Sequence, residues 1–414
     1  MDTGRWITSK RLRAHGLLLA IALWSVYLWN LGTPGLRDRH GNLKGTDFLH
    51  FYTLGIVANE HHGASLYDIS AQSALVAQRV PQASGIRYLP LYPPQVSIIF
   101  VPFSHLWYGT ALGLWWTFSA GLYAACCFIV WRLCPNLKRY GGTVAILATG
   151  FPAFFHLIAW GQTSALALGC FTIFFLFVRQ KRKFLAGLAL GCLVFKPQLG
   201  LAAAIVFLAC GEWEIIFGTI VAAVAELAAG VLYYGIQPLR VWLRTLWHVR
   251  EMAPWLEPRL YQTHCLRTFW AMLVPWSSLS LALYGFSGVI VVGWTVWVWR
   301  HSREFEPRLA LLLLATVLIS PHLTVYDLVI LAPAFLLLAD WLLVNPRRAS
   351  RGLIGTMLYL LYLLPLVGPL SYWTHVQLSV IAMVVLCYLI WKELRSGAAS
   401  LETAQFAKVQ AAET

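Results

Sequence analysis

The sequence has 414 residues, of which 59% are hydrophobic and 12% are charged. Soluble globular proteins carry about 25% charged residues, so this composition excludes a soluble globular protein and indicates an all-α polytopic membrane protein. The net charge of +14 comes from short basic clusters between apolar stretches and not from one solvated face. The charge therefore does not predict nucleic acid as a partner.

The apolar stretches can be taken in chain order, and most are long enough for a helix to cross a bilayer. They cover residues 15–32, 108–131, 141–159, 163–178, 184–210, 214–234, 278–299, 308–320, 324–344, 351–367 and 375–391. The first stretch follows Arg5, Lys10, Arg11 and Arg13 and has no small-residue cleavage site after it. We therefore expect it to be a signal anchor that remains in the protein.

The stretch 184–210 is divided by Lys196-Pro197-Gln198, where the proline predicts a broken helix. If its two arms cross separately, all the basic connections share the cytoplasmic side with the N-terminus, as the positive-inside rule requires. These connections are 131–139, 179–183, 300–308, 345–351 and 391–395. The pattern predicts about twelve transmembrane segments, some half-length or re-entrant, in a single membrane domain over residues 1–395. Residues 396–414 predict a short, disordered cytoplasmic tail.

In this topology the unusual polar features fall on the outer side of the membrane. They are the loop 33–107, the turn Trp160-Gly161-Gln162, the break at Lys196, the loop 235–277 and Ser320-Pro321-His322. The outer loops contain helix-like segments at 48–60 and 240–252, and the second is amphipathic. The cytoplasmic connections are too short for a Rossmann-type domain and carry no GxGxxG or P-loop motif, which argues against a nucleotide-sugar enzyme. The clustering predicts an extracytoplasmic active site.

Asp47 lies in GTDFLHFYTLG (45–55), between a glycine-threonine pair and aromatic residues. As a helix N-cap, it would accept hydrogen bonds from backbone N–H groups. As a partly desolvated carboxylate at a membrane surface, it would be suited to act as a general base. The two interpretations are compatible.

Lys196 is an ionisable residue within an apolar stretch, which makes it a candidate functional residue. It could pair with a carboxylate such as Glu226, or it could bind an anion together with the helix N-terminus that begins at Pro197. His322 and Gln162 could each simply cap a helix or belong to the same site. His61-His62 lacks the spacing of a zinc motif, so we expect no zinc there.

Several motifs occur in order along residues 45–335. They are D-F-x-x-F-Y (47–52), G-x-x-L-Y-D (63–68), Y-P-P (92–94), G-Q (161–162), L-A-G-x-x-x-G (185–191), K-P-Q (196–198) and S-P-H-x-x-x-Y-D (320–327). In this order the motifs resemble glycosyltransferase family 87, a polytopic group of GT-C type that includes the mycobacterial mannosyltransferase of phosphatidylinositol mannoside synthesis.

The resemblance implies a GT-C-type fold and a polyprenyl-phosphate-linked sugar donor, with mannose favoured. The acceptor would be a lipid or glycan hydroxyl, and Asp47 would be the general base of an inverting transfer. A leaving phosphate requires cations, for which the candidates are Lys196, His322, Arg259 and Arg267. Candidate substrate-orienting residues are Tyr52, Tyr92, Gln162, Gln198, His264, Tyr326 and Asp327. A single Asp before Phe48 favours a mechanism without a metal, and we expect no cofactor.

Two other functions fit the same sequence. A secondary transporter or lipid flippase would also have many spans and a broken helix with a buried lysine, although no inverted-repeat symmetry is visible. A non-catalytic membrane scaffold is the second. In the preferred interpretation the protein lies in the cell (inner) membrane, with both termini in the cytoplasm.

Overall fold

The computed structural model describes residues 7–249, 251–252, 259–344 and 350–413, with side chains described as far as residue 397. The described residues form helices and contain no β-strand, only isolated bridges such as that between Thr263 and Thr324. The predicted all-α polytopic fold is confirmed. Residue 250 of the amphipathic segment and residues 345–349 of one basic connection lie outside the described residues.

Five long helices form the frame of the molecule. They are α1 (Ser9–Leu31), α6 (Tyr108–Arg132), α12 (Trp213–Tyr234), α16 (Ser277–His301) and α21 (Leu378–Glu413). Between them pack α7 (Gly141–Thr149), α8 (Pro152–Trp160), α9 (Ser164–Arg179), α10 (Lys183–Gly191), α11 (Leu201–Cys210), α17 (Phe305–Ile319), α18 (Ala332–Val344) and α19 (Arg351–Leu363).

The other helices are short. They are α2 (Thr46–Asn59), α3 (Ile69–Arg79), α4 (Gln95–Ile99), α5 (Val101–Ser104), α13 (Ile236–Trp247), α15 (Leu266–Leu273) and α20 (Ser371–Thr374). The 3-10 helices are η1 (Gly63–Tyr67), η2 (Pro81–Ala83), η3 (Pro135–Tyr140), η4 (Cys192–Phe195), η5 (Pro197–Leu199), η6 (Leu260–Gln262), η7 (Val325–Leu331) and η8 (Leu364–Leu370).

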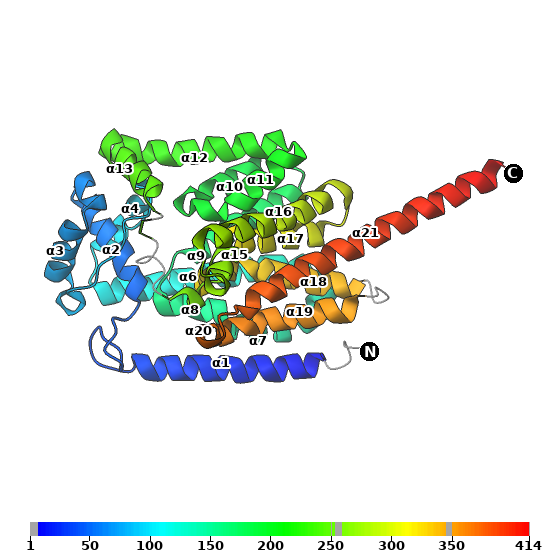
Figure 1. The fold of residues 1–414 in the computed structure, drawn as a ribbon. Coiled ribbons are helices and arrows are strands. Elements are labelled where there is room, and N and C mark those ends of the chain that lie inside the picture. Colours follow the sequence, from blue (N-terminus) through cyan, green and yellow to red (C-terminus); the bar gives the residue numbers. More distant parts are fainter. Residues whose placement is uncertain (1–6, 250, 253–258, 345–349, 414) are drawn as a thin grey trace.

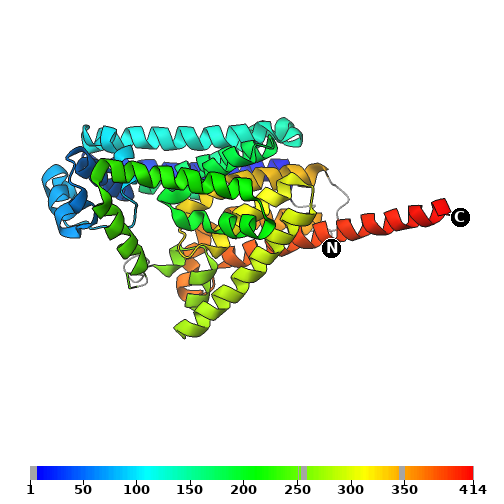
Figure 2. The same cartoon turned by 90° about the horizontal axis from the view of Figure 1, so that it is seen from above.

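The long helices run side by side, and the loops gather at one end of them (Figure 1). At that end lie α2, α3, α4 and α13, whereas the start of α1 and the end of α21 lie at the opposite end, as Figure 2 also shows. We call the first end the loop end. The sequence predicted the two long loops on the outer side of the membrane and both termini in the cytoplasm, and this orientation stays a prediction.

Six helical segments of the described chain are long and apolar enough to cross a membrane. They are Ser9–Leu31, Tyr108–Arg132, Trp213–Tyr234, Ser277–His301, Val325–Val344 and Arg351–Thr374. A seventh results if Pro135–Thr149 and Pro152–Trp160, which meet at a 45° bend, form one span. Shorter apolar helices such as Ser164–Arg179 lie between these segments. The count of about twelve segments stays a prediction.

The predicted break in the stretch 184–210 is observed. Lys196 separates η4 from η5, so neither arm continues as an α-helix through it. The first arm packs closely on α12 through glycines: a Cβ on Gly187 would lie 2.1 Å from the carbonyl oxygen of Ile215, and a Cβ on Gly218 would lie 2.2 Å from that of Phe184. Such small residues allow two membrane helices to approach backbone to backbone.

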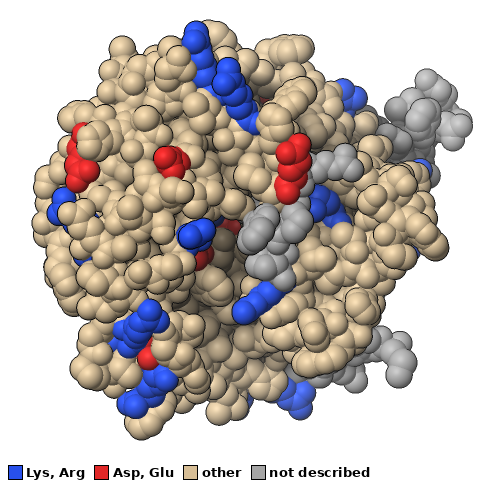
Figure 3. Space-filling model, turned by 60° about the vertical axis from the view of Figure 1, so that its left-hand side comes forward, with Lys and Arg blue, Asp and Glu red and all other residues tan. Residues whose placement is uncertain are grey.

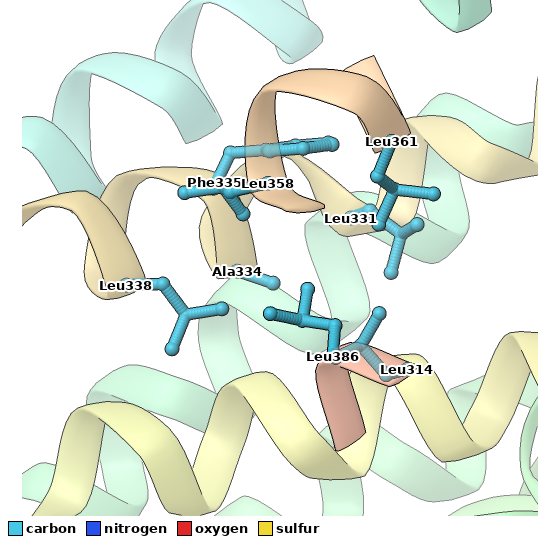
Figure 4. Close-up of a pocket in the computed structure, with 8 residues that line it drawn as sticks. All are labelled: Leu314, Leu331, Ala334, Phe335, Leu338, Leu358, Leu361 and Leu386. Atoms are coloured by element: carbon cyan, nitrogen blue, oxygen red, sulfur yellow. The ribbon is translucent and has the colours of Figure 1, made fainter. Parts of the chain in front are cut away.

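Most of the side chains buried within the bundle are apolar. A small pocket there (Figure 4) is lined by Leu314, Leu331, Ala334, Phe335, Leu338, Leu358, Leu361 and Leu386. None of these side chains can bind a phosphate or a sugar hydroxyl, so this pocket reflects packing rather than function.

Helix α21 continues through residues 396–413, where the sequence predicted a disordered tail. The segment is rich in alanine and also contains glutamate and glutamine. These residues have high intrinsic helix propensity, and this explains how a polar segment extends an apolar helix.

Candidate active site

Asp47 is the second residue of α2, at the loop end of the molecule. The N-cap of this helix is Gly45, which has no side chain with which to cap it. The carboxylate of Asp47 instead accepts a hydrogen bond of 2.6 Å from Nε2 of Gln162. The position near a helix N-terminus favours a negative charge, and the hydrogen bond ties Asp47 to a distant part of the chain.

Gln162 reaches Asp47 because the turn after α8 packs directly against the start of α2. Gly161 has a φ of 72°, and a Cβ on it would lie 2.7 Å from Cβ of Phe48, so only glycine fits there. Its carbonyl accepts a hydrogen bond of 3.0 Å from the indole of Trp115. Nε2 of Gln162 also donates to the hydroxyl of Tyr326 at 3.2 Å. One amide therefore joins three segments of the chain.

Lys196 belongs to a second, more buried cluster. Its ammonium group lies 2.8 Å from Oδ1 of Asp327 and 3.1 Å from Oγ of Ser164, which itself donates to Asp327 at 2.5 Å. It also lies 5.2 Å from the ring centroid of Tyr326, within reach of a cation–π interaction. The carboxylate that pairs with Lys196 is thus Asp327, not Glu226.

The two clusters interact electrostatically. Burial raises the pKa of Asp47 to about 6, while the hydrogen bond from Gln162 and the charge of Lys196 lower it and the charge of Asp327 raises it. The side chain of Asp47 is still partly exposed. A carboxylate with a pKa raised to about 6 that keeps part of its surface exposed is suited to general-base catalysis near neutral pH.

Figure 3 shows the loop end as a surface with a hollow, bordered by both basic and acidic side chains. Within the described residues, no group of three or more His, Cys, Asp or Glu side chains could hold a metal ion. The polar groups near Asp47 are amide, hydroxyl and ammonium groups, which suit a polar organic substrate.

Comparison with known proteins identifies the family. Residues 91–321 match the family described as glycosyltransferase family 87, which is more than half of the chain. The chain belongs to glycosyltransferase family 87. The resemblance seen in the sequence is confirmed, and the protein is a membrane glycosyltransferase. No curated protein and no solved structure matches it.

In this membrane glycosyltransferase the matched residues include Gln162 and Lys196 but not Asp47 or Asp327. The importance of Asp47 therefore depends on its geometry, and its hydrogen bond to Gln162 connects it to the part of the chain that defines the family.

Two of the predicted cations lie near the Lys196 cluster. Nε of Arg267 donates to the carbonyl of Pro321, next to His322. The charge of His322 in turn acts on Asp327. Arg259 is exposed at the start of η6, and no contact described for it reaches the clusters. The loop 235–277 thus brings at least one arginine to the segment that carries His322.

The predicted orienting residues divide into two groups. The first group belongs to the two clusters and consists of Gln162, Tyr326 and Asp327. Tyr92 lies close enough to Lys196, Asp327 and Asp47 to interact electrostatically with their charges. Gln198 is partly exposed in η5, two residues after Lys196. The second group consists of Tyr52 and His264, which form hydrogen bonds outside the clusters.

The polar atoms of Tyr52 and His264 form hydrogen bonds with groups outside the two clusters. The hydroxyl of Tyr52 donates to the carbonyl of Leu106 at 2.7 Å. His264 is buried, and its Nδ1 lies 2.7 Å from the hydroxyl of Ser379, at the start of α21. Both side chains form hydrogen bonds with segments that pack beside them. The residue types alone could not predict these partners.

Sequence reasoning did not single out Ser164, Thr163, Tyr88 or His50. Ser164 and Thr163 belong to the Trp-Gly-Gln-Thr-Ser turn, so the proximity of Gln162 was a signal that pointed to them. Tyr88 donates to the carbonyl of Thr46, beside Asp47. His50 lies one helical turn after Asp47 and is discussed below.

Proposed function

We propose that this glycosyltransferase moves a hexose, with mannose favoured, from a polyprenyl-phosphate donor to a hydroxyl group of a lipid or glycan acceptor. The reaction takes place at the extracytoplasmic face of the cell (inner) membrane, in a fold of GT-C type. One observation carries the proposal: an accessible carboxylate and a buried ammonium group share one network at the loop end.

The chemistry requires a base on one side of the sugar and cations on the other. Asp47 accepts the proton of the acceptor hydroxyl as its oxygen forms a bond to the anomeric carbon. The bond from that carbon to the phosphate oxygen breaks, and the phosphate monoester leaves with the electron pair. The transition state is oxocarbenium-like, and fixed positive groups stabilise the charge that develops on the leaving phosphate.

The charges within the Lys196 cluster indicate how the donor phosphate is held. Asp327 already neutralises Lys196, so this pair alone offers little net attraction to an anion. The additional positive charge comes from Arg267 and Arg259, and Arg267 contacts the segment beside His322, whose imidazole can donate a hydrogen bond to the phosphate. In this arrangement Lys196 donates a hydrogen bond to the phosphate from a fixed position. The arginines of the basic loop 235–277 supply the net positive charge.

Asp47 acting as a base, rather than as a nucleophile, leads to inversion at the anomeric carbon. The polyprenyl chain of the donor stays in the bilayer beside the apolar helices, which brings the phosphate to the membrane surface where the loop end lies. No cofactor or metal is needed for this route.

Transfer of sugar by the purified protein tests this proposal. The protein in detergent is incubated with radiolabelled polyprenyl-phosphate mannose and a lipid extract, with glucose, galactose and arabinose donors in parallel. We expect label in a new glycosylated product whose anomeric configuration is opposite to that of the donor. A transporter or flippase would transfer nothing in detergent, and retention of configuration would overturn the assignment of Asp47 as a simple base.

A further inference from the structure

His50 is a buried polar residue whose polar atoms have no partner. It lies three residues after Asp47 on α2, and thus on the same face of the helix. Its side chain is almost fully buried, with 4% exposed. Within the described residues, neither Nδ1 nor Nε2 has a hydrogen-bond partner. Leaving such a group unpaired costs stability, so its retention calls for an explanation.

Thr163 has the same property. Its hydroxyl is buried and forms no hydrogen bond of ordinary geometry in the described part of the chain, and its one polar neighbour is the hydroxyl of Tyr92. It follows Gln162, which holds Asp47, and it lies beside the side chain of Tyr92. Two unpaired polar groups thus occur next to the residues that adjoin the proposed base.

Aromatic rings connect these groups. The ring centroid of His50 lies 5.0 Å from that of Tyr88 and 5.7 Å from that of Tyr92. Tyr92 lies close enough to Lys196, Asp327 and Asp47 to interact electrostatically with them, so it is near both the proposed base and the buried cation. A group bound beside Tyr92 would therefore lie close to the groups that carry the proposed reaction.

On the basis of the proposed function, we propose that His50 and Thr163, with the rings of Tyr88 and Tyr92, form a subsite that recognises a hydroxyl group of the transferred sugar. A neutral imidazole carries one donor and one acceptor, and a threonine hydroxyl carries both. A sugar hydroxyl also donates and accepts, and the C–H face of a sugar ring packs on aromatic rings. The subsite supplies specificity, whereas Asp47 and the cations supply the chemistry.

The protonation state of His50 suits this role. Burial lowers the pKa of His50 to about 4, so the imidazole is neutral at physiological pH. A charged imidazole would instead offer two donors and no acceptor. Recognition by His50 therefore does not change between about pH 5 and pH 8.

Access to His50 passes Tyr88. This tyrosine is partly exposed and belongs to the irregular segment between η2 and α4. Its hydroxyl donates to the carbonyl of Thr46. When the ring of Tyr88 shifts, the sugar can reach the imidazole while its anomeric carbon stays near Asp47.

The test uses His50→Phe and Thr163→Val in the full-length protein. Each variant is assayed with the accepted polyprenyl-phosphate sugar and with a set of donors that each lack one ring hydroxyl. The wild type should discriminate against one of these deoxy donors by roughly 10- to 100-fold in kcat/KM. We expect both variants to lose most of this discrimination and to raise KM for the complete donor.

Stability separates recognition from a structural role. Because His50 has no hydrogen-bond partner to lose and Thr163 has only a weak contact with Tyr92, their apolar replacements should melt at about the same temperature as the wild type or higher in the absence of donor. Thr53→Val is the matched control: Thr53 is buried on α2, but its hydroxyl already donates to the carbonyl of Leu49 at 2.7 Å. This control should keep the discrimination of the wild type.

Several results would contradict the proposed subsite. One is that both variants discriminate against the deoxy donor as strongly as the wild type does. Another is that the variants melt at a lower temperature but keep the wild-type KM for the complete donor. A response to acceptors that lack a hydroxyl, instead of to deoxy donors, would also refute it. A wild type that transfers no sugar contradicts the proposed function itself, whereas an active wild type with unresponsive variants contradicts only the subsite.

Discussion

Asp47 and Asp327 are two carboxylates in one network with opposite surroundings. Asp47 is partly exposed and accepts a hydrogen bond from a neutral amide. Asp327 is buried and accepts hydrogen bonds from Lys196, from Ser164, and from the backbone and side chain of Thr324. Burial without a cation in contact raises the pKa of Asp47, whereas direct pairing with a cation keeps Asp327 ionised.

Because their surroundings differ, the two aspartates have different roles. A carboxylate that already accepts four hydrogen bonds has little capacity left for a substrate proton, so Asp327 holds Lys196 and η7 in place. Asp47 has open acceptor capacity and a pKa near neutrality, so it is the one able to take a proton. Changes at each residue should therefore separate activity from stability.

Asp47→Asn should have the largest effect on activity. Removing a general base lowers the rate roughly 10²- to 10⁴-fold, while the amide preserves the shape of the side chain and the amount of folded protein. Rates of label transfer and detergent size-exclusion profiles measure the two quantities. Glu60→Gln is the matched control, because Glu60 follows the same helix and only forms surface ion pairs. Transfer by Asp47→Asn at the rate of this control would remove Asp47 from the mechanism.

Lys196→Met should mainly affect stability. Breaking a buried ion pair leaves Asp327 uncompensated and costs about 3–5 kcal/mol; the side chains of Lys196 and Asp327 are 5% and 3% exposed. Thermal melting in detergent measures the loss. The double variant Lys196→Met, Asp327→Leu should regain much of the melting temperature without regaining activity. If the single variant melts like the wild type, the pair does not hold the site together.

Gln162→Leu should shift the pH dependence of transfer. The wild-type kcat/KM should fall as the pH is lowered through about 6, because Asp47 becomes protonated there. The hydrogen bond from Gln162 favours the ionised carboxylate, so its loss raises the pKa of Asp47 further and moves this limb to higher pH. An unchanged midpoint, with or without lower activity, would show that Asp47 is not the titrating base.

The smallest expected effect is on the stability of Asp47→Asn. The folded-state pKa of Asp47, about 6, lies above its ordinary value of 3.8. The wild type therefore loses stability as the pH rises from about 4 to about 6, where the unfolded chain ionises more readily than the folded one, and there is no such effect below the ordinary pKa. Asp47→Asn should melt slightly higher than the wild type at pH 8, and this difference should shrink as the pH is lowered from 6 toward 4. A lower melting temperature at pH 8 would mean that the carboxylate stabilises the fold.

Part of this structure could be predicted from the sequence. Apolar length and basic connections predicted the helical membrane fold, and Pro197 predicted the break beside Lys196. The partner of Lys196 could not be predicted, because Glu226 and Asp327 both follow it in apolar stretches and spacing does not show which faces meet. Tyr52 and His264 were candidates by residue type, but each bonds to a segment packed beside it. His50 lacks a hydrogen-bond partner because of the side chains that distant segments pack around it. Those side chains can be identified only in the folded chain.

The most direct test is a structure of the protein bound to a non-transferable polyprenyl-phosphonate sugar. We expect the phosphonate beside Lys196, His322 and Arg267, with the anomeric carbon turned toward Asp47 and room for one acceptor oxygen between them. A phosphonate bound at the end opposite the loop end, or a sugar on the far side of the Lys196 cluster from Asp47, would contradict the proposed mechanism.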